Sequence, residues 1–311
     1  MTGTAMHRPL LAISLKASAI TLFTVMAAMI KAVSEHVPPG ESVFFRSALA
    51  IPVILVWLAA RGEIRNGLVP QSIKGHVLRG LLGTTAMGLS FAGLAYLPLP
   101  EVTAIGYAAP IFTLVLASVM LGERIRAIRI SAVAVSLLGV LIMLWPILGG
   151  TSPHEEAAAL GAALILAATM CRSVVQIHIR QMVQSENTAA IVFYFSLTAT
   201  VLSLLTMPFG WVVPTGRELG LLLAAGLLGG IAQILVTSAY RFGSASLLAP
   251  YDYTSMLVAI VIGYVWFGDL PTLWVICGAG LVIAGNGVVI WREHQLGIER
   301  AKARAVSYPK P

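Results

Sequence analysis

The feature that most constrains this chain is a series of apolar runs, each of about 20 residues, the length that a helix needs to cross the hydrocarbon core of a bilayer. Charged residues make up 11% of the sequence, whereas they make up about 25% of an ordinary soluble domain. A soluble core cannot bury this much apolar sequence, so we predict an all-α integral membrane protein. Ten transmembrane helices are expected, over residues 10–32, 42–60, 74–96, 100–121, 128–148, 157–179, 188–209, 219–240, 244–267 and 271–291.

The Lys and Arg residues predict how the chain is oriented, because short loops that are rich in them stay on the cytoplasmic side. With the N-terminus inside, only Lys31, Arg46 and Arg217 fall on the outer side, and most other basic residues, Arg79 among them, fall on the cytoplasmic side. Both termini are therefore expected in the cytoplasm. The net charge of +7 is spread over short loops and forms no patch, which argues against a nucleic-acid partner.

The two halves of the chain resemble each other. Two pairs of neighbouring residues in the first half recur in the second: Ala95 and Tyr96 as Ala239 and Tyr240, and Gly122 and Glu123 as Gly268 and Asp269. Five spans in each half is an odd number, so the second copy enters the membrane inverted relative to the first, an arrangement typical of transporters. We predict one five-helix repeat over residues 10–148, a second over 157–291, and a cytoplasmic tail over 292–311.

Several short motifs resemble those of a known family. The segment FFRSALA in the second span, LGE at the end of the fourth and APYDYTS in the ninth are similar to the drug/metabolite transporter superfamily, EamA type, over residues 10–291. Asp269 stands where that family usually has Glu. The resemblance implies a multi-pass protein of the bacterial inner membrane. It also implies secondary transport, and a substrate cavity lined by spans one to four and six to nine, with spans five and ten outside it.

Asp252 is the first candidate for a substrate-binding residue, because an ionisable residue inside a span is expensive and usually functional. It could pair with a cationic group of the substrate, or carry a coupling proton. A structural alternative also exists, since Pro is favoured at the first position of a helix and Asp in its first turn. On that interpretation Pro250 and Asp252 begin a shorter helix near Ala249.

Tyr251 and Tyr253 flank Asp252 and offer hydroxyl groups and stacking surfaces, although at most one of them shares its face of a helix. Tyr107 and Pro110 occupy the corresponding part of the fourth span. Pro110 removes a backbone hydrogen bond and should bend that helix. For Tyr251 or Tyr253 taken alone, a packed aromatic or a residue of the membrane-interface belt is the favoured interpretation, and the bend at Pro110 is a gate or plain packing.

Lys31 and Arg46 lie at the outer ends of the first two spans, and both match basic residues of the family. Either could attract anionic groups or hold an acidic residue in a closed outer gate. Lys31 alternatively extends to the membrane interface. For Arg46 we predict a structural ion pair with Glu35, Glu41 or Glu101.

Polar residues in spans six and eight predict a hydrated interior or hydrogen bonds between helices. The candidates are Arg172 and His178 in span six and Gln233 in span eight, with Arg172 as a partner for Asp252. The glycines of span ten suggest a homodimer face. The segment PHEE at residues 153–156 lacks further ligands, so neither a metal site nor a cofactor is expected.

The leading functional hypothesis is a secondary transporter that moves a small metabolite by alternating access in the lipid bilayer. The tyrosines around Asp252 favour uptake of a cofactor-like compound, such as riboflavin or S-adenosylmethionine, and export of amino acids or drug-like metabolites is the alternative. An enzyme is not expected, because no HExxH, nucleophile elbow or phosphate loop occurs. A channel would need a ring of selectivity residues, which nothing in the sequence indicates.

Overall fold

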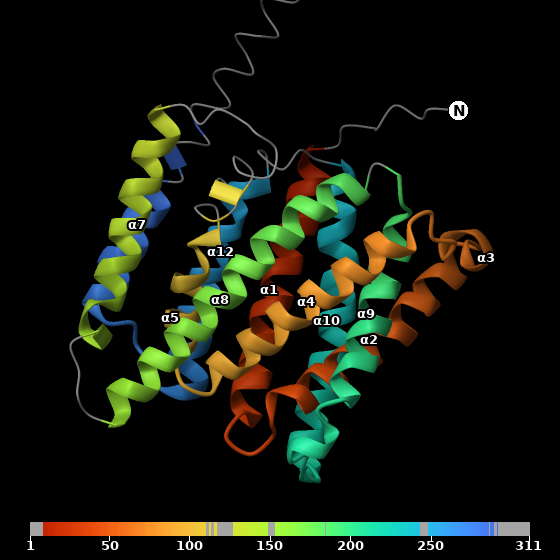
Figure 1. The fold of residues 1–311 in the computed structure, drawn as a ribbon, viewed down its shortest axis with the longest axis horizontal. Helices are drawn as coiled ribbons and strands as arrows, with labels where there is room; N and C mark the ends of the chain where they lie inside the picture. The colour runs from red at the N-terminus through yellow and green to blue at the C-terminus, as the bar shows by residue number, and fades with distance from the viewer. Residues whose placement is uncertain are drawn as a thin grey trace, which may run out of the picture.

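The computed structural model describes residues 9–109, 112, 115–116, 127–148, 153–183, 185–242, 248–285, 287–288 and 291. Within these residues the chain is a bundle of helices without strands (Figure 1). The prediction of an all-α membrane protein is confirmed. Pro110 and the tail over 292–311 lie outside the described residues, as do Gly122 and Glu123.

The helices in chain order are α1 (Pro9–Val33), α2 (Pro39–Ala60), α3 (Ile64–Gly67), α4 (Ile73–Leu94), α5 (Leu99–Gly106), α7 (Ala127–Leu148), α8 (Pro153–Met182), α9 (Thr188–Leu204), η1 (Met207–Phe209), α10 (Gly216–Phe242), η2 (Ala249–Tyr253), α12 (Thr254–Ile262) and η3 (Gly263–Phe267). A further apolar helix runs over Leu273–Gly285.

Among the described residues, five helices are long and apolar enough to cross a membrane, and they coincide with predicted spans one, two, three, six and eight. Shorter apolar helices occupy spans five, seven, nine and ten. The fourth span begins as α5, and most of its remainder lies outside the described residues. Local sequence accounts for several helix ends: Pro39 stands at the first turn of α2, and the Ser72 hydroxyl caps α4 by accepting the Gly75 N–H at 3.2 Å.

The ninth span is not one regular α-helix. It starts with the 3₁₀ segment η2, whose sequence is APYDY, continues as α12, and closes with a π-helical turn in η3. Pro250 and Asp252 lie in the first turn of η2, as the helix-start interpretation predicted. Gly268 ends the span with φ of 72°, a backbone conformation that residues with a Cβ rarely adopt.

Helices from both halves of the chain form the body of the bundle. α10 packs against α1 and α2, α9 packs against α2 and α4, and α8 packs against α4. α7 and the helix Leu273–Gly285 lie together at one edge (Figure 1). The resemblance to the family implies this peripheral position for spans five and ten.

Gly278 of span ten packs against another helix of the same chain. A Cβ at Gly139 of α7 would lie 2.6 Å from the carbonyl oxygen of Gly278, so the two backbones are in direct contact. Gly278 is therefore unavailable for a dimer face. A Cβ at Gly280 would meet nothing within 4 Å, and a homodimer through that side of the helix stays a prediction.

Candidate functional site

Asp252 forms an ion pair with a residue from the first span. Lys16 Nζ lies 2.7 Å from Asp252 Oδ1 and donates a hydrogen bond of 3.1 Å to the Tyr240 hydroxyl. The Lys16 side chain is 5% exposed, whereas that of Asp252 is 46% exposed. The structure thus joins α1, α10 and η2 through one cation, one carboxylate and one hydroxyl.

Small residues allow these three groups to meet. Ala12 lies one turn before Lys16, and Ala239 directly precedes Tyr240; both are fully buried, in a cluster with Leu248. Because neither Ala fills the space between the helices, α1 and α10 approach closely enough for the Lys16 ammonium to reach Tyr240 and Asp252. The Lys16–Asp252–Tyr240 group is the candidate site.

The predicted partner of Asp252 was wrong. Arg172 instead donates a hydrogen bond of 2.7 Å to the Ser90 hydroxyl of α4. Lys16 is a site residue that the sequence-based candidates lack, although it carries the same signal as Asp252, an ionisable residue within an apolar run. The two residues depend on each other, because removal of the carboxylate would leave the buried Lys16 charge without a counter-ion, while the 46% exposure of Asp252 lets solvent screen the pair.

Tyr107 and Tyr253 come from different halves of the chain and meet. Their ring centroids lie 5.1 Å apart at an interplanar angle of 73°. The Tyr107 hydroxyl donates to the Tyr253 carbonyl at 3.2 Å and lies 2.9 Å from the Ser255 hydroxyl. Tyr251 is half-buried, and its carbonyl accepts a hydrogen bond from the Thr254 hydroxyl. A role of any of these tyrosines in substrate binding stays a prediction.

Lys31 ties the end of α1 to the segment after α4. Its Nζ donates to the Leu97 carbonyl at 2.9 Å and lies 5.5 Å from the centroid of the Phe267 ring. His178 makes a comparable contact at the other end of α4, where its Nε2 lies 3.0 Å from the Gly75 carbonyl oxygen. Neither residue belongs to the Lys16–Asp252–Tyr240 group.

The ion pair predicted for Arg46 is absent: Arg46 contacts no carboxylate among the described residues. Its Nη2 lies 3.4 Å from Gln233 Oε1, beyond the usual range of an N–H···O bond. Its Cζ lies 5.4 Å from the centroid of the Phe195 ring. Glu41, one of the proposed partners, accepts the Val212 N–H at 3.1 Å instead.

Arg79, which the sequence assigns to the cytoplasmic side, is a second buried cation beside Phe195. It lies within α4, is 5% exposed, and its Cζ is 4.0 Å from the centroid of the same ring. The Nε and Nη1 atoms of both arginines are buried and have no hydrogen-bond partner in the described chain. Burying an ion costs several kcal/mol, and a cation–π contact returns about 0.5–2 kcal/mol.

Two buried glutamates join the halves of the chain at opposite ends of the bundle. Glu41, at the start of α2, accepts the Val212 N–H of the segment that precedes α10. Glu186, which precedes α9, accepts the N–H groups of Gln71 and Ser72 before α4, both through Oε1 at 3.0 and 2.6 Å. Each carboxylate thus supplies the acceptor for backbone donors of the opposite half.

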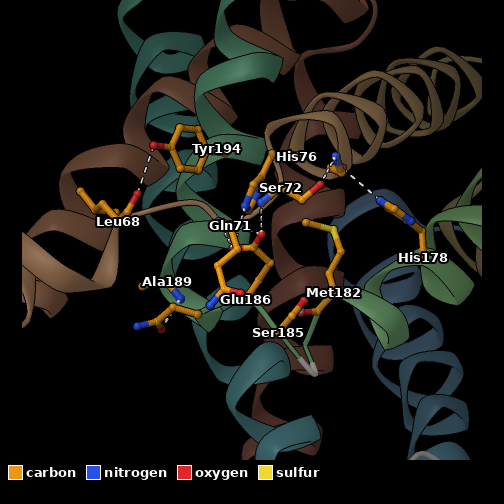
Figure 2. Close-up of polar contacts among 12 residues, drawn as sticks. Leu68, Gln71, Ser72, His76, His178, Met182, Ser185, Glu186, Ala189 and Tyr194 are labelled. Atoms are coloured by element: carbon orange, nitrogen blue, oxygen red, sulfur yellow. Dashed lines mark hydrogen bonds and ion pairs between the residues drawn. The ribbon is translucent and has the colours of Figure 1, made fainter.

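The Glu186 contact also includes a histidine. His76 Nε2 lies 3.2 Å from Glu186 Oε2, and Figure 2 shows the carboxylate directed at Gln71, Ser72 and His76. Burial opposes ionisation of Glu186, but the two N–H donors and the His76 ring outweigh it and lower the pKa of this carboxyl below its usual value.

Glu186→Gln should make the free energy of unfolding less dependent on pH in the acidic range. A lowered native pKa stabilises the fold above the unfolded-state pKa of about 4.3, and this contribution disappears as the pH falls through the native pKa. At pH 7 the variant should lose about 1.5–3 kcal/mol of stability, the magnitude of hydrogen bonds to a charged group. Below about pH 4 the difference in stability between the variant and the parent protein should shrink. Thermal unfolding in detergent measures this difference. Glu63→Gln, at an exposed position, should change neither value; a gap that stays constant with pH would contradict the assignment.

Comparison with known proteins shows which family this chain resembles. The sequence model of the EamA-like transporter family matches residues 10–145 and 159–291, one match in each half. A protein known from a crystal structure superposes with a TM-score of 0.64 over 92% of this chain and 98% of its own length, at 20% identity. That likeness supports the fold alone.

Curated relatives are named as transporters of three different compounds. The pseudopaline exporter of Pseudomonas aeruginosa is 30% identical over 84% of this chain and 89% of its own. The S-adenosylmethionine uptake transporter of Rickettsia prowazekii is 27% identical over 81% of this chain and 83% of its own. The riboflavin transporter of Vibrio cholerae is 27% identical over 76% of this chain and 77% of its own.

Proposed function

Since the chain belongs to the EamA-like transporter family and is a transporter of small molecules, we propose that its cargo is a positively charged, cofactor-like metabolite taken up across the bacterial inner membrane. S-adenosylmethionine, which carries a sulfonium and an ammonium group, is the cargo named for its relatives that fits this description best. The observation that carries the proposal is the carboxylate of Asp252, which pairs with the buried Lys16 while 46% of its side chain is exposed.

The Asp252 carboxylate can bind two cationic groups at once. Lys16 occupies Oδ1 at 2.7 Å, and 46% of the Asp252 side chain stays exposed. A cationic group of the cargo would approach this exposed side, where a carboxylate offers a strong, charge-assisted acceptor. Protonation of Asp252 would weaken its hold on Lys16 and on the cargo together, so the same residue provides a place for a coupling proton.

Alternating access requires contacts between the halves that can open at one end at a time. We take residues 10–148 and 157–291 as the two moving repeats. Glu41 and Glu186 both bridge them, at opposite ends of the bundle, and both contacts are formed in this structure. Opening toward the cytoplasm would break the Glu186 contact, and opening outward would break the Glu41 contact.

This orientation follows the distribution of Lys and Arg, which favours cytoplasmic termini. It predicts that a cysteine introduced at Glu63, which is exposed after α2, is labelled by a membrane-impermeant thiol reagent only in inverted vesicles. The proposal assigns no catalytic step to the chain.

Uptake by proteoliposomes tests the proposal. Labelled S-adenosylmethionine should accumulate with saturation and counterflow, and lowering the pH inside or outside should change the rate if a proton is coupled. Unlabelled riboflavin and neutral amino acids should compete weakly. Export of amino acids or drug-like metabolites is the second candidate, favoured by the relatives named as exporters; it would replace the first if S-adenosylmethionine gave no saturable flux and an amino acid did.

A further inference from the structure

Arg46 and Arg79 converge from opposite ends of the bundle. Arg46 lies two turns into α2 and Arg79 nearly two turns into α4, and these consecutive helices run in opposite directions, so each residue is about 10 Å from its own end. Both side chains reach Phe195, which lies near the middle of α9, with their Cζ atoms 5.4 and 4.0 Å from the ring centroid. The two guanidinium groups therefore lie against the same ring inside the protein.

Among the residues that the structure describes, two positive charges and no carboxylate contribute to this centre. Arg46 is 3% exposed and Arg79 is 5% exposed. In the part of the chain that the structure describes, neither forms an ion pair, and the Nε and Nη1 atoms of both have no acceptor. The attraction of two cations to one ring is smaller than the cost of burying them. A centre of this kind needs an anion to be fully satisfied.

The backbone packs closely around the two arginines. A Cβ at Gly229 of α10 would lie 3.2 Å from Arg46 Nε, and a Cβ at Gly83 of α4 would lie 2.8 Å from the Phe195 ring. Glycine at both positions leaves the space that the arginine side chains and the ring occupy. A planar guanidinium group can donate two parallel hydrogen bonds to one carboxylate. A carboxylate is therefore a suitable ligand for two arginines that lack a counter-ion.

One face of α10 connects this centre to the candidate site. Gln233, next to Arg46, and Tyr240, next to Lys16, are seven residues apart, which is two helical turns or about 10.5 Å. Thr237 lies between them and is buried. A single small solute can span this distance, with a cationic group at Asp252 and an anionic group at Arg46.

We propose that Arg46 and Arg79, with Phe195 and Gln233, form a binding site for a carboxylate group of the transported solute, so that the cargo belongs to the amino-acid-bearing metabolites. This inference rests on the proposed function, because it assumes that the Asp252 site and the arginine centre bind parts of one solute.

Binding to the purified full-length protein tests the site without transport. Sodium acetate, compared with sodium chloride at equal ionic strength, should raise the thermal unfolding midpoint of the parent protein with saturation. Arg46→Gln and Arg79→Gln should each raise the half-saturating acetate concentration at least tenfold. Arg61→Gln, which removes an exposed arginine that contacts Trp57, should leave it unchanged.

Two further measurements keep the result interpretable. Arg46→Lys and Arg79→Lys keep the charge without the fork, so they should bind acetate more weakly than the parent protein and more tightly than the Gln variants, including where a Gln variant does not fold. Without acetate, Arg79→Gln should be at least as stable as the parent protein, because it removes a buried unpaired charge.

The site is overturned if acetate acts equally on the parent protein and both Gln variants, if chloride reproduces its effect, or if inorganic phosphate alone stabilises. Failure of the site and failure of the proposed function remain distinguishable. Arginine-dependent acetate binding without S-adenosylmethionine flux rejects that cargo and keeps the site, whereas saturable flux with arginine-independent acetate binding does the reverse.

Discussion

Asp252→Asn is expected to reduce transport by about 100-fold or more, because it removes the carboxylate and leaves Lys16 buried without a counter-ion. A hydrogen bond to a charged group contributes about 1.5–3 kcal/mol, and about 1.4 kcal/mol corresponds to a tenfold change, so loss of the contact with the cargo accounts for an effect of this size. Asp252 is 46% exposed, so solvent screens its pair with Lys16 and the loss of that pair adds less. The initial rate of uptake into proteoliposomes measures the effect. Asp269→Asn, the same substitution beyond the other end of the ninth span, should retain the parent rate.

The double variant Lys16→Met/Asp252→Asn separates the two roles of the carboxylate. Removing both charges relieves the cost of the orphaned ammonium, so the folded fraction should return toward that of the parent protein. Transport should stay low, since the exposed side of Asp252 is the proposed contact for the cargo. Recovery of both folding and transport in the double variant would show that the ion pair is structural and that Asp252 does not meet the cargo.

The sequence was sufficient to locate Asp252 but not its partner. Apolar run length and the rarity of charge inside a span depend on single segments, so the spans and Asp252 could be identified directly. The partner depends on how α1, α10 and η2 are rotated against one another. Lys16 and Arg172 are equivalent on the sequence criterion, and only the packing through Ala12 and Ala239 decides for Lys16.

The arginines illustrate a second limit. Arg79 lies close to the end of its span, where the positive-inside rule counts it toward the cytoplasmic side, but that rule does not reveal that the side chain enters the bundle and reaches Phe195. Arg46 lies a few residues inside its span, and the prediction of an ion pair followed from that position. Glu41 is instead used by the backbone of the opposite half, a contact between segments about 170 residues apart that no local pattern encodes.

Glycines in α10 are also ambiguous in sequence, because a glycine in a span can be a packing contact or an exposed position. Gly226 and Gly220 lie on the same helix and have opposite environments. A Cβ at Gly226 would lie 2.7 Å from the Phe45 carbonyl oxygen and 2.6 Å from the Leu49 Cβ, both on α2. A Cβ at Gly220 would meet nothing within 4 Å.

Gly226→Ala is therefore expected to destabilise the protein by about 1–3 kcal/mol, the usual range for overpacking, since α2 and α10 have to move apart to admit one methyl group. Gly220→Ala should stabilise it by up to about 1 kcal/mol, because Ala is the better helix former and the space is free. Thermal unfolding in detergent should give midpoint shifts of opposite sign for this matched pair. Because α10 carries both Gln233 and Tyr240, a displacement at Gly226 should also lower uptake, whereas Gly220→Ala should not. Equal shifts for the two variants would show that α2 and α10 are not in backbone contact at Gly226, and that α10 is not held in register by this contact.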